Sequence, residues 1–295
     1  MGSAVSKQRV LVEHQAQAAP FTPTTRDLRW FAHIARHGPQ SSEHLFELTR
    51  DTHRCRDSAL RRLQLLRELG YVDLPHQQRS IAKADFNPFV HELGRKQRAA
   101  LKHWGIAHSL TRPSGHWWHA FTVASITSAI DICATQAGHA FIPGDQILSI
   151  KNAQLAIPVG RHLLVPDQLF ALRTAEGFRS YVLEMDHGTE PVQSSAARKS
   201  LKSSAERYSL VLRQQLHKRH YGLKSNLVVL WVFTSPVRRE RFLDLVRRYA
   251  GDQAGGFTTQ VVEGGFPRWQ GVEASVRGEW IAGNGRRVAL VLNGG

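Results

Sequence analysis

The stretch YVLEMDH, residues 181–187, decides how the longer C-terminal part of the chain folds. Apolar residues lead into Glu184 and Asp186, which are two positions apart and therefore point to the same face of a β-strand. An earlier stretch, LLVPDQLFAL at residues 163–172, places Asp167 after a proline within another apolar run. Neighbouring strands lie about 4.8 Å apart, so carboxylates on one face can share a Mg²⁺ or Mn²⁺ ion. We expect Asp167, Glu184 and Asp186 to form such a metal site.

Strands and helices alternate around this stretch, which is typical of an α/β domain over residues 117–265. The apolar patterns predict helices at residues 121–136, 192–220 and 238–250, and strands at residues 146–150, 162–173, 179–186, 227–234 and 258–263. Residues 266–295 are rich in glycine and predict a C-terminal β-hairpin extension.

Basic residues lie on the helix predicted at residues 192–220, which follows the acids in the sequence. Lys199 or Lys202 is expected to bring a positive charge to the site, which makes five candidate catalytic residues: Asp167, Glu184, Asp186, Lys199 and Lys202. The same helix is expected to lie along a DNA backbone through Arg198, Lys199, Lys202 and Arg207. The alternative to a metal site is that Asp167 lies in a turn and that Glu184 and Asp186 lie at a solvated strand end. The alternative to a DNA-binding helix is a helix whose basic face is solvated.

Other catalytic patterns are missing. His187 is a candidate general base or metal ligand, with an exposed strand-end histidine as the alternative. The sixteen histidines show no HExxH or closely spaced zinc pattern, and the chain has no nucleophile elbow, Walker loop or dinucleotide-binding loop. Cys55 and Cys133 have no spacing that suggests a disulfide or a zinc site.

Residues 25–110 predict a separate domain. Helices at residues 26–37, 41–50 and 56–69 are followed by strands at 71–74, 80–86 and 89–94, with a polar turn at 75–79 and a closing helix at 95–104. This order resembles a winged helix-turn-helix domain, and the third helix and wing offer candidate DNA contacts: Arg54, Arg56, Ser58, Arg61, Arg62, Arg79 and Lys83. An ordinary amphipathic helix with a solvated arginine face is the alternative. Residues 1–24 predict a flexible leader, and residues 105–116 a linker.

Charge and hydropathy limit the classes of function. Of the 295 residues, 42% are apolar and 21% are charged, which excludes a purely disordered chain. The net charge of +15 favours DNA as the partner, although a charge kept for solubility is the alternative. No apolar run reaches the roughly 20 residues that cross a bilayer, and no signal peptide is evident. We expect a cytoplasmic protein without membrane contacts.

Two resemblances rest on the residues quoted above. Pro166-Asp167 and Glu184-Met185-Asp186 resemble the two acidic elements of the PD-(D/E)XK, restriction-endonuclease-like superfamily, except that Asp186 stands at the usual lysine position. The stretch LEMDHGTEP, residues 183–191, with Lys199, Lys202 and Tyr208 after it, resembles the replication-relaxation family of plasmids and integrative elements. These resemblances imply a fold in which an α+β winged helix-turn-helix domain precedes an α/β nuclease-like domain with a central mixed sheet.

Three functions are compatible with this reasoning. The first is a metal-dependent DNA endonuclease or nickase of a mobile element, acting in replication or mobilisation. The second is a noncatalytic DNA-binding accessory factor whose nuclease-like domain is inactive. The third is a transcriptional regulator with a ligand-sensing C-terminal domain. Other replication or mobilisation proteins are expected partners, and the sequence is compatible with a homodimer.

Overall fold

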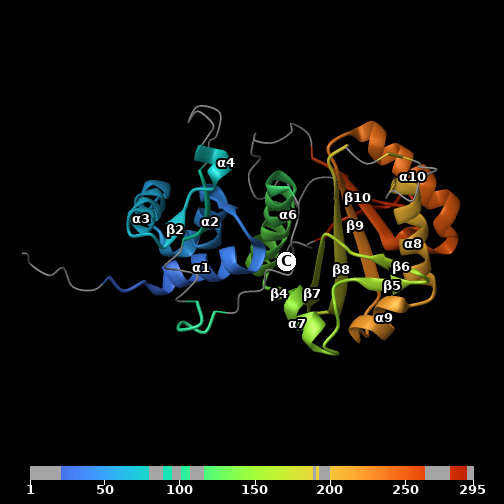
Figure 1. Ribbon diagram of the computed structural model, residues 1–295, viewed down its shortest axis with the longest axis horizontal. Coiled ribbons are helices and arrows are strands. Elements are labelled where there is room, and N and C mark those ends of the chain that lie inside the picture. The colour runs from blue at the N-terminus through green and yellow to red at the C-terminus, as the bar shows by residue number, and fades with distance from the viewer. Residues whose placement is uncertain are drawn as a thin grey trace, which may run out of the picture.

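The computed structural model describes residues 21–79, 89–94, 101–106, 116–188, 191–192, 200–262 and 280–290. A smaller N-terminal group of helices and strands lies beside a large sheet with helices on both faces (Figure 1). The chain is therefore an α+β protein built on a seven-stranded mixed sheet, and the mixed sheet predicted from the sequence is confirmed. None of the described helices has the length and apolar character needed to cross a membrane.

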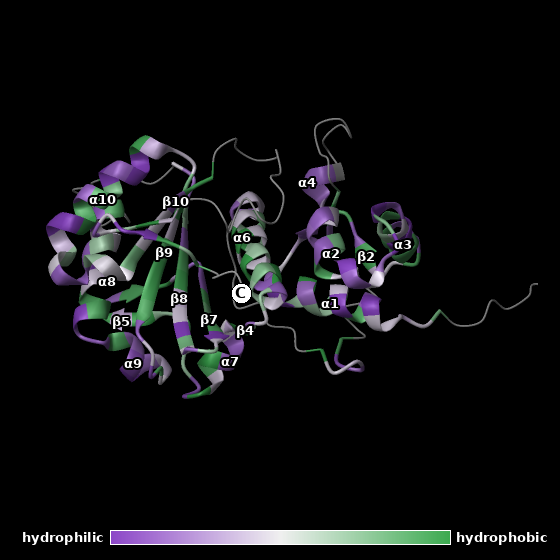
Figure 2. Ribbon diagram, turned by 180° about the vertical axis from the view of Figure 1, so that it is seen from behind, coloured by the Kyte–Doolittle hydropathy of each residue, from purple (hydrophilic) through white to green (hydrophobic). Residues whose placement is uncertain are grey.

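The large sheet combines parallel and antiparallel neighbours. Its order is β12 (Arg287–Val288), β11 (Trp280–Ala282), β10 (Phe257–Val261), β9 (Leu227–Phe233), β8 (Gly177–Asp186), β7 (Gln168–Thr174) and β4 (Ala140–Pro143). β9 pairs in parallel with β8 and with β10, and the other neighbours are antiparallel. β9 is apolar along its whole length because strands cover both its edges and helices cover both its faces (Figure 2).

The two faces of β8 bury different residues. Tyr181, Leu183 and Met185 pack with α6 (Trp117–Gln136) on one face. Val182 packs on the other face with α8 (Leu201–Arg213), α9 (Leu216–Tyr221) and α10 (Pro236–Ala250). Side chains alternate along a strand, so Glu184 and Asp186 lie on the face of Val182.

α6 has no solvent-facing polar side from Phe121 to Ala134, because it is covered on both sides. It contacts β4, β7 and β8 of the sheet, and it also contacts helices of the N-terminal group (Figure 1). Fourteen of its residues, from Phe121 to Ala134, are buried. A helix without a polar face is typical of one enclosed by protein, and here α6 joins the two parts of the chain.

The N-terminal group consists of short helices on a three-stranded antiparallel sheet in the order β1-β3-β2. Trp30, Phe31, Leu45 and Leu66 form part of its core. The Thr24 hydroxyl accepts the backbone N–H of Asp27 at the start of the first helix. The elements are α1 (Thr25–His37), β1 (Gln40–Ser41), α2 (Ser42–Leu48), η1 (Arg50–Thr52), α3 (Arg56–Glu68), β2 (Val72–Asp73), α4 (His76–Arg79) and β3 (Val90–Leu93).

Three predicted elements of the C-terminal part were wrong in detail. Residues 146–150 are not a strand; they belong largely to a helix, α7 (Gly144–Ser149), whose buried residues Gly144 and Ile147 have helical spacing. The single strand predicted at 162–173 is divided at Pro166, which has no N–H to donate, into β6 (His162–Leu164) and β7. β6 pairs with β5 (Ile157–Val159) in a small separate sheet. The long helix predicted at 192–220 ends at Arg213, because Gln215 adopts a left-handed conformation before α9 begins.

Some of the elements predicted for the N-terminal part lie within the described residues and others do not. The polar turn predicted at 75–79 contains a short helix, α4, and the strand predicted at 89–94 is confirmed as β3. The strand predicted at 80–86 lies outside the described residues, as do residues 95–100 of the predicted closing helix. At the other end of the chain, β11 and β12 form a hairpin that extends the large sheet.

Candidate functional site

Asp167 lies immediately before β7, and Glu184 lies near the end of the neighbouring strand β8. The pairing of the two strands ends at Gln168 and Leu183. The Asp167 backbone N–H donates to the Leu183 carbonyl at 2.9 Å, and its Oδ2 accepts the Met185 N–H at 2.8 Å. Asp167 is thus fixed against the strand that carries the second acid.

Two histidines lie beside Asp167. The Nε2 atom of His119, in the first turn of α6, is 3.0 Å from Asp167 Oδ1. The rings of His119 and His187 are 5.4 Å apart. Burial lowers the pKa of His187, and the neighbouring His119 lowers it further. Among the residues that the structure describes, the buried Nε2 atom of His187 has no hydrogen-bond partner.

Glu184 is buried beneath α8. Its side chain accepts a hydrogen bond of 2.5 Å from the hydroxyl of Tyr208, which is itself completely buried. Burial raises the pKa of Tyr208 well above its ordinary value, and the negative charge of Glu184 raises it further. Tyr208 therefore keeps its proton and holds one oxygen of Glu184 in place.

Asp186 faces an arginine at the start of α10. Arg238 donates from Nε to Oδ2 at 2.5 Å and from Nη2 to Oδ1 at 2.9 Å, a bidentate ion pair. The Gly188 N–H donates to Oδ1 at 3.1 Å, from a left-handed backbone conformation that suits glycine. Both oxygens of Asp186 are thus held by Arg238 at the end of β8.

The basic residues predicted on the following helix are only partly described. Arg198 and Lys199 lie outside the described residues. The Lys202 ammonium lies 5.4 Å from the ring centre of Tyr249 and 4.0 Å from Glu206, on the outer side of α8, and Arg207 is half-buried. Lys202 is therefore directed toward α10 and solvent, whereas Tyr208 on the same helix is directed toward Glu184.

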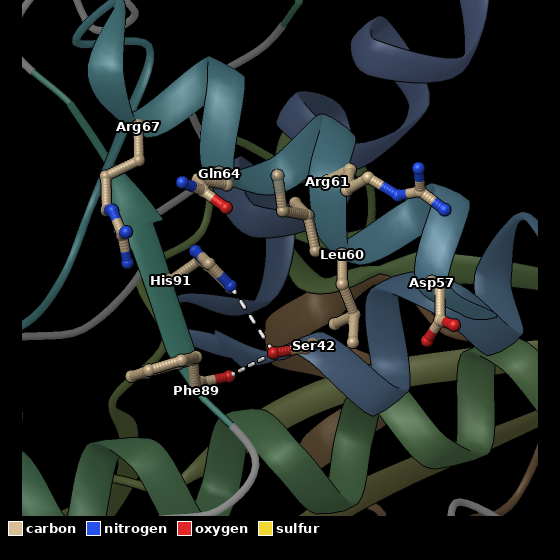
Figure 3. Close-up of a pocket in the computed structure, with 9 residues that line it drawn as sticks. Ser42, Asp57, Leu60, Arg61, Gln64, Arg67, Phe89 and His91 are labelled. Atoms are coloured by element: carbon tan, nitrogen blue, oxygen red, sulfur yellow. Dashed lines mark hydrogen bonds between the residues drawn. The ribbon is translucent and has the colours of Figure 1, made fainter. Parts of the chain in front are cut away.

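The predicted DNA contacts cluster on α3, beside a groove of about 370 Å³ (Figure 3). Arg54, Arg56 and Arg61 are exposed, although Arg56 forms an ion pair with Glu43, and Ser58 is half-buried beside Cys55. The groove lies between α3, the start of α2 and β3, and it is lined by Ser42, Asp57, Leu60, Arg61, Leu63, Gln64, Arg67, Phe89 and His91. Arg79 ends α4, and Lys83 lies outside the described residues.

Arg62 differs from its neighbours on α3, because its side chain is directed into the protein. It donates from Nε and Nη2 to the carboxylate of Asp27 at 3.1 and 2.5 Å, and its guanidinium lies 4.9 Å from the ring centre of Phe21. Burial alone would raise the pKa of Asp27, but the hydrogen bonds from Arg62 and Thr24 hold it below its ordinary value. Arg62 therefore joins α3 to α1.

His91, at the floor of this groove, makes the stability of the chain sensitive to acid. Desolvation, with the nearby charge of Arg67, lowers the pKa of His91 from 6.5 to about 3. The unfolded chain therefore gains a proton here below pH 6.5, while the folded chain gains it only near pH 3. The contribution to stability is complete above pH 6.5 and falls by about 1.4 kcal/mol for each pH unit below it.

We expect urea unfolding of the parent to show a marked loss of stability from pH 7.5 to pH 5.5. His91→Gln should show a smaller loss over the same interval, because glutamine does not titrate. An equal pH dependence in the two proteins would contradict the assignment of this loss to His91.

The sequence analysis missed one buried cluster. His33 and His37 on α1 meet Asp131 on α6, so that the N-terminal group and α6 share a polar contact. Burial lowers the pKa of His33 well below its ordinary value and also lowers that of His37. Two histidines four residues apart on one helix were the visible signal, but Asp131 lies more than 90 residues later in the sequence.

One comparison with known proteins found a match. Residues 31–227, about two thirds of the chain, match the model of a family described as replication-relaxation. No match was found among curated proteins or among solved structures. The matched region begins within α1, includes both acids, and ends at the start of β9. The chain therefore belongs to the replication-relaxation family.

Proposed function

We propose that this chain is a DNA-binding replication protein of a plasmid or mobile element, and that it cuts DNA with Mg²⁺ or Mn²⁺ held by Asp167 and Glu184. The observation that carries the proposal is that these two buried acids lie at the same end of the paired strands β7 and β8, where Asp167 bonds to the backbone of Leu183 and Met185 on either side of Glu184. Family membership supports the role in replication. The mixed sheet flanked by helices supports a restriction-endonuclease-like core.

The donor set fits a hard divalent cation. Mg²⁺ and Mn²⁺ prefer carboxylate oxygens, and one or two carboxylates with phosphate and water oxygens complete a typical Mg²⁺ site. Such an ion polarises the scissile phosphate and lowers the pKa of a bound water. Hydrogen bonds from Met185 and Tyr208 orient the two acids, and His119 contacts Asp167, so these groups position the ligands.

Asp186 has a different role in this proposal from the one predicted from the sequence. Its two oxygens are engaged by Arg238, and the guanidinium is held at the end of the sheet beside the acids. We assign Asp186 to orienting Arg238, and Arg238 to binding a phosphate of the DNA strand. Arginine has five N–H donors, and the two bonds to Asp186 use only part of them.

The proposal is tested by incubating the purified chain with supercoiled plasmid, linear duplex and single-stranded DNA. Mg²⁺ or Mn²⁺ should convert supercoiled DNA to nicked or linear forms, and EDTA should stop the reaction. Retained DNA binding without cleavage of any substrate would contradict the catalytic part of the proposal and leave the DNA-binding part in place.

A noncatalytic accessory factor is the second candidate function, and one observation favours it. Both Glu184 and Asp186 are buried and hydrogen-bonded by protein groups, Tyr208 and Arg238. Such a network stabilises the sheet without any metal. The nuclease-like part would then hold DNA or a replication protein. The cleavage test separates the two candidates.

DNA binding is assigned to the exposed side of α3 and to the neighbouring groove, in a winged-helix arrangement. Three helices and the β1-β3-β2 sheet support this arrangement, and the net charge of +15 favours a polyanionic partner. Gln64 and Arg61 line the groove with side chains that can reach base edges or phosphates.

We expect Arg61→Ala to weaken duplex binding several-fold and to reduce the slope of log K against log salt by about one unit, because one phosphate contact is lost. Fluorescence anisotropy across a salt series measures both quantities. Arg179→Ala is the matched control, because this exposed arginine lies on β8, far from α3 in the sequence. Identical salt slopes for parent and Arg61→Ala would contradict the assignment.

A further inference from the structure

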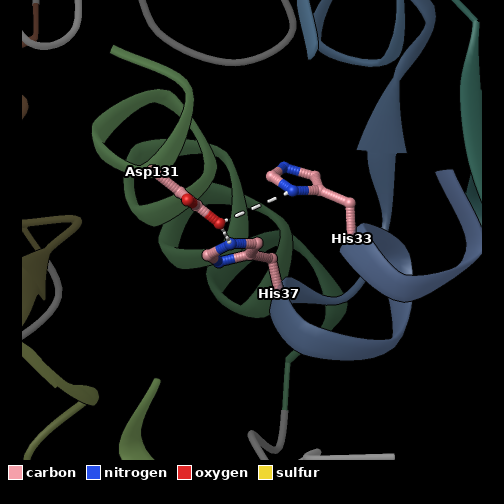
Figure 4. A group of neighbouring side chains, drawn as sticks. All are labelled: His33, His37 and Asp131. Atoms are coloured by element: carbon pink, nitrogen blue, oxygen red, sulfur yellow. Dashed lines mark hydrogen bonds and ion pairs between the residues drawn. The ribbon is translucent and has the colours of Figure 1, made fainter. Parts of the chain in front are cut away.

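Two histidines and one aspartate converge where α1 packs on α6 (Figure 4). His33 and His37 are one helical turn apart on α1, and Asp131 faces both of them from α6. All three are buried. We propose that His33, His37 and Asp131 form a transition-metal site, best suited to Zn²⁺, that joins the N-terminal group to α6.

The spacing of the candidate ligand atoms fits a tetrahedral ion. His37 Nε2 lies 2.9 Å from Asp131 Oδ2, His33 Nδ1 lies 3.7 Å from the same oxygen, and one ligand atom from each residue lies within 4.8 Å of the others. Zn²⁺ bonds of about 2.0–2.1 Å place tetrahedral ligand atoms about 3.3 Å apart. The two measured distances lie on either side of this value. Two imidazoles and a carboxylate are also a frequent ligand set of Zn²⁺.

The hydrogen bonds around the histidines orient the ligand nitrogens. Thr127 Oγ1 lies 3.0 Å from His37 Nδ1 and 3.0 Å from the Val123 carbonyl. When the hydroxyl donates to that carbonyl, it accepts the Nδ1–H of His37, and the lone pair of Nε2 then points at Asp131. Ser128 Oγ can accept a hydrogen bond from the Nε2–H of His33 at 2.7 Å in the same way, which leaves Nδ1 as the ligand.

In this arrangement no proton lies between His37 Nε2 and Asp131 Oδ2, and a metal ion between them would be bound by both atoms. The other arrangement places a proton on Nε2, which donates to Asp131 with no metal bound. The two arrangements differ in one measurable property, which is the uptake of a metal by the protein.

The surroundings of the cluster allow the displacement of Arg36. Arg36 Nη1 is 2.7 Å from Asp131 Oδ2, where it competes with a metal for the carboxylate. Its side chain is 35% exposed, so it can turn toward solvent when the ion binds.

This site is independent of the proposed cleavage site. The pair of Asp167 and Glu184 offers only carboxylate oxygens to a hard cation, whereas this cluster offers two imidazole nitrogens. It joins helices from two parts of the chain, so the expected role of the metal is to fix the N-terminal group on α6.

The test uses the full chain after dialysis against EDTA and then against metal-free buffer. Titration with Co²⁺ should give visible absorption bands of a tetrahedral site that saturate at about one equivalent, and Zn²⁺ should displace them. His37→Gln and Asp131→Asn should lose the bands. Arg36→Ala should keep them and bind more tightly, because a competing cation is removed. Asp167→Ala should also keep them, which separates this site from the cleavage site.

Two results would overturn the proposal, and the first does not depend on any variant. A parent protein that shows no Co²⁺ bands with micromolar protein and metal has no such site. Bands that persist unchanged in both His37→Gln and Asp131→Asn place the metal elsewhere. If these variants unfold, X-ray absorption of the Zn²⁺-loaded parent decides instead: two imidazoles among nitrogen and oxygen ligands support the site, and any other count contradicts it.

Discussion

Asp167→Ala and Glu184→Gln should each reduce metal-dependent DNA cleavage by at least about 100-fold, because each removes a ligand of the ion. Loss of a group that only orients a ligand typically costs 10–100-fold, so loss of the ligand itself is expected to exceed that range. Affinity for DNA should remain close to that of the parent, since the exposed side of α3 and the groove beside it are unchanged. Nicking of supercoiled plasmid and anisotropy with a labelled duplex measure the two properties in parallel.

Glu206→Gln is the matched control for these variants. Glu206 is an acid on α8, but it lies beside Lys202 on the outer side of the helix. Its replacement should leave cleavage unchanged. Tyr208→Phe should have an intermediate effect, because it removes the hydrogen bond to Glu184 and keeps the carboxylate. Full cleavage by both Asp167→Ala and Glu184→Gln would place the reaction outside the β7–β8 site.

Arg62→Ala should destabilise the chain by about 3 kcal/mol, because it leaves the carboxylate of Asp27 buried without its ion-pair partner. The Arg62 side chain is 19% exposed and that of Asp27 is fully buried, so solvent cannot replace the lost contact. The cation–π contact with Phe21 is lost as well. Urea unfolding at pH 7.5 measures this difference in the free energy of unfolding.

Arg61→Ala is the comparison for this prediction, because Arg61 is the exposed neighbour on the same helix. Its stability should remain within about 0.5 kcal/mol of the parent, while its affinity for DNA falls. The two adjacent arginines should thus affect different properties: Arg62→Ala mainly lowers stability, and Arg61→Ala mainly lowers the affinity for DNA. Equal stabilities for the parent and Arg62→Ala would contradict the role assigned to the Asp27 ion pair.

The sequence predicted those features that depend on local periodicity. The alternation along residues 181–186 placed Glu184 and Asp186 on one face of a strand, and the apolar run at 227–234 predicted a buried central strand. The short helix α7 was missed, because a few apolar residues fit either a strand or a helix. Pro166 was visible in the sequence, but β5 at Ile157–Val159, the strand with which β6 pairs in the separate small sheet, was not predicted.

The partners of the acids could not be read from the sequence. Tyr208 lies 24 residues beyond Glu184, and Arg238 lies 52 residues beyond Asp186. Only the packing of α8 and α10 on the sheet brings them together. The role of Arg62 was hidden for the same reason: Asp27 lies 35 residues earlier, and an arginine on an amphipathic helix has the same pattern whether it is solvated or paired.

The enclosed helix α6 has a consequence for where cleavage would fall. The proposed DNA-binding surface on α3 belongs to a group that packs on one side of α6, and the strands that carry the acids pack on its other side. His119 in the first turn of α6 also contacts Asp167. If α6 keeps the proposed binding surface and the acids at a fixed separation, the number of base pairs from the bound sequence to the cut should be constant. Mapped break positions should therefore follow the recognition sequence when it is moved along a plasmid, whatever bases stand at the break.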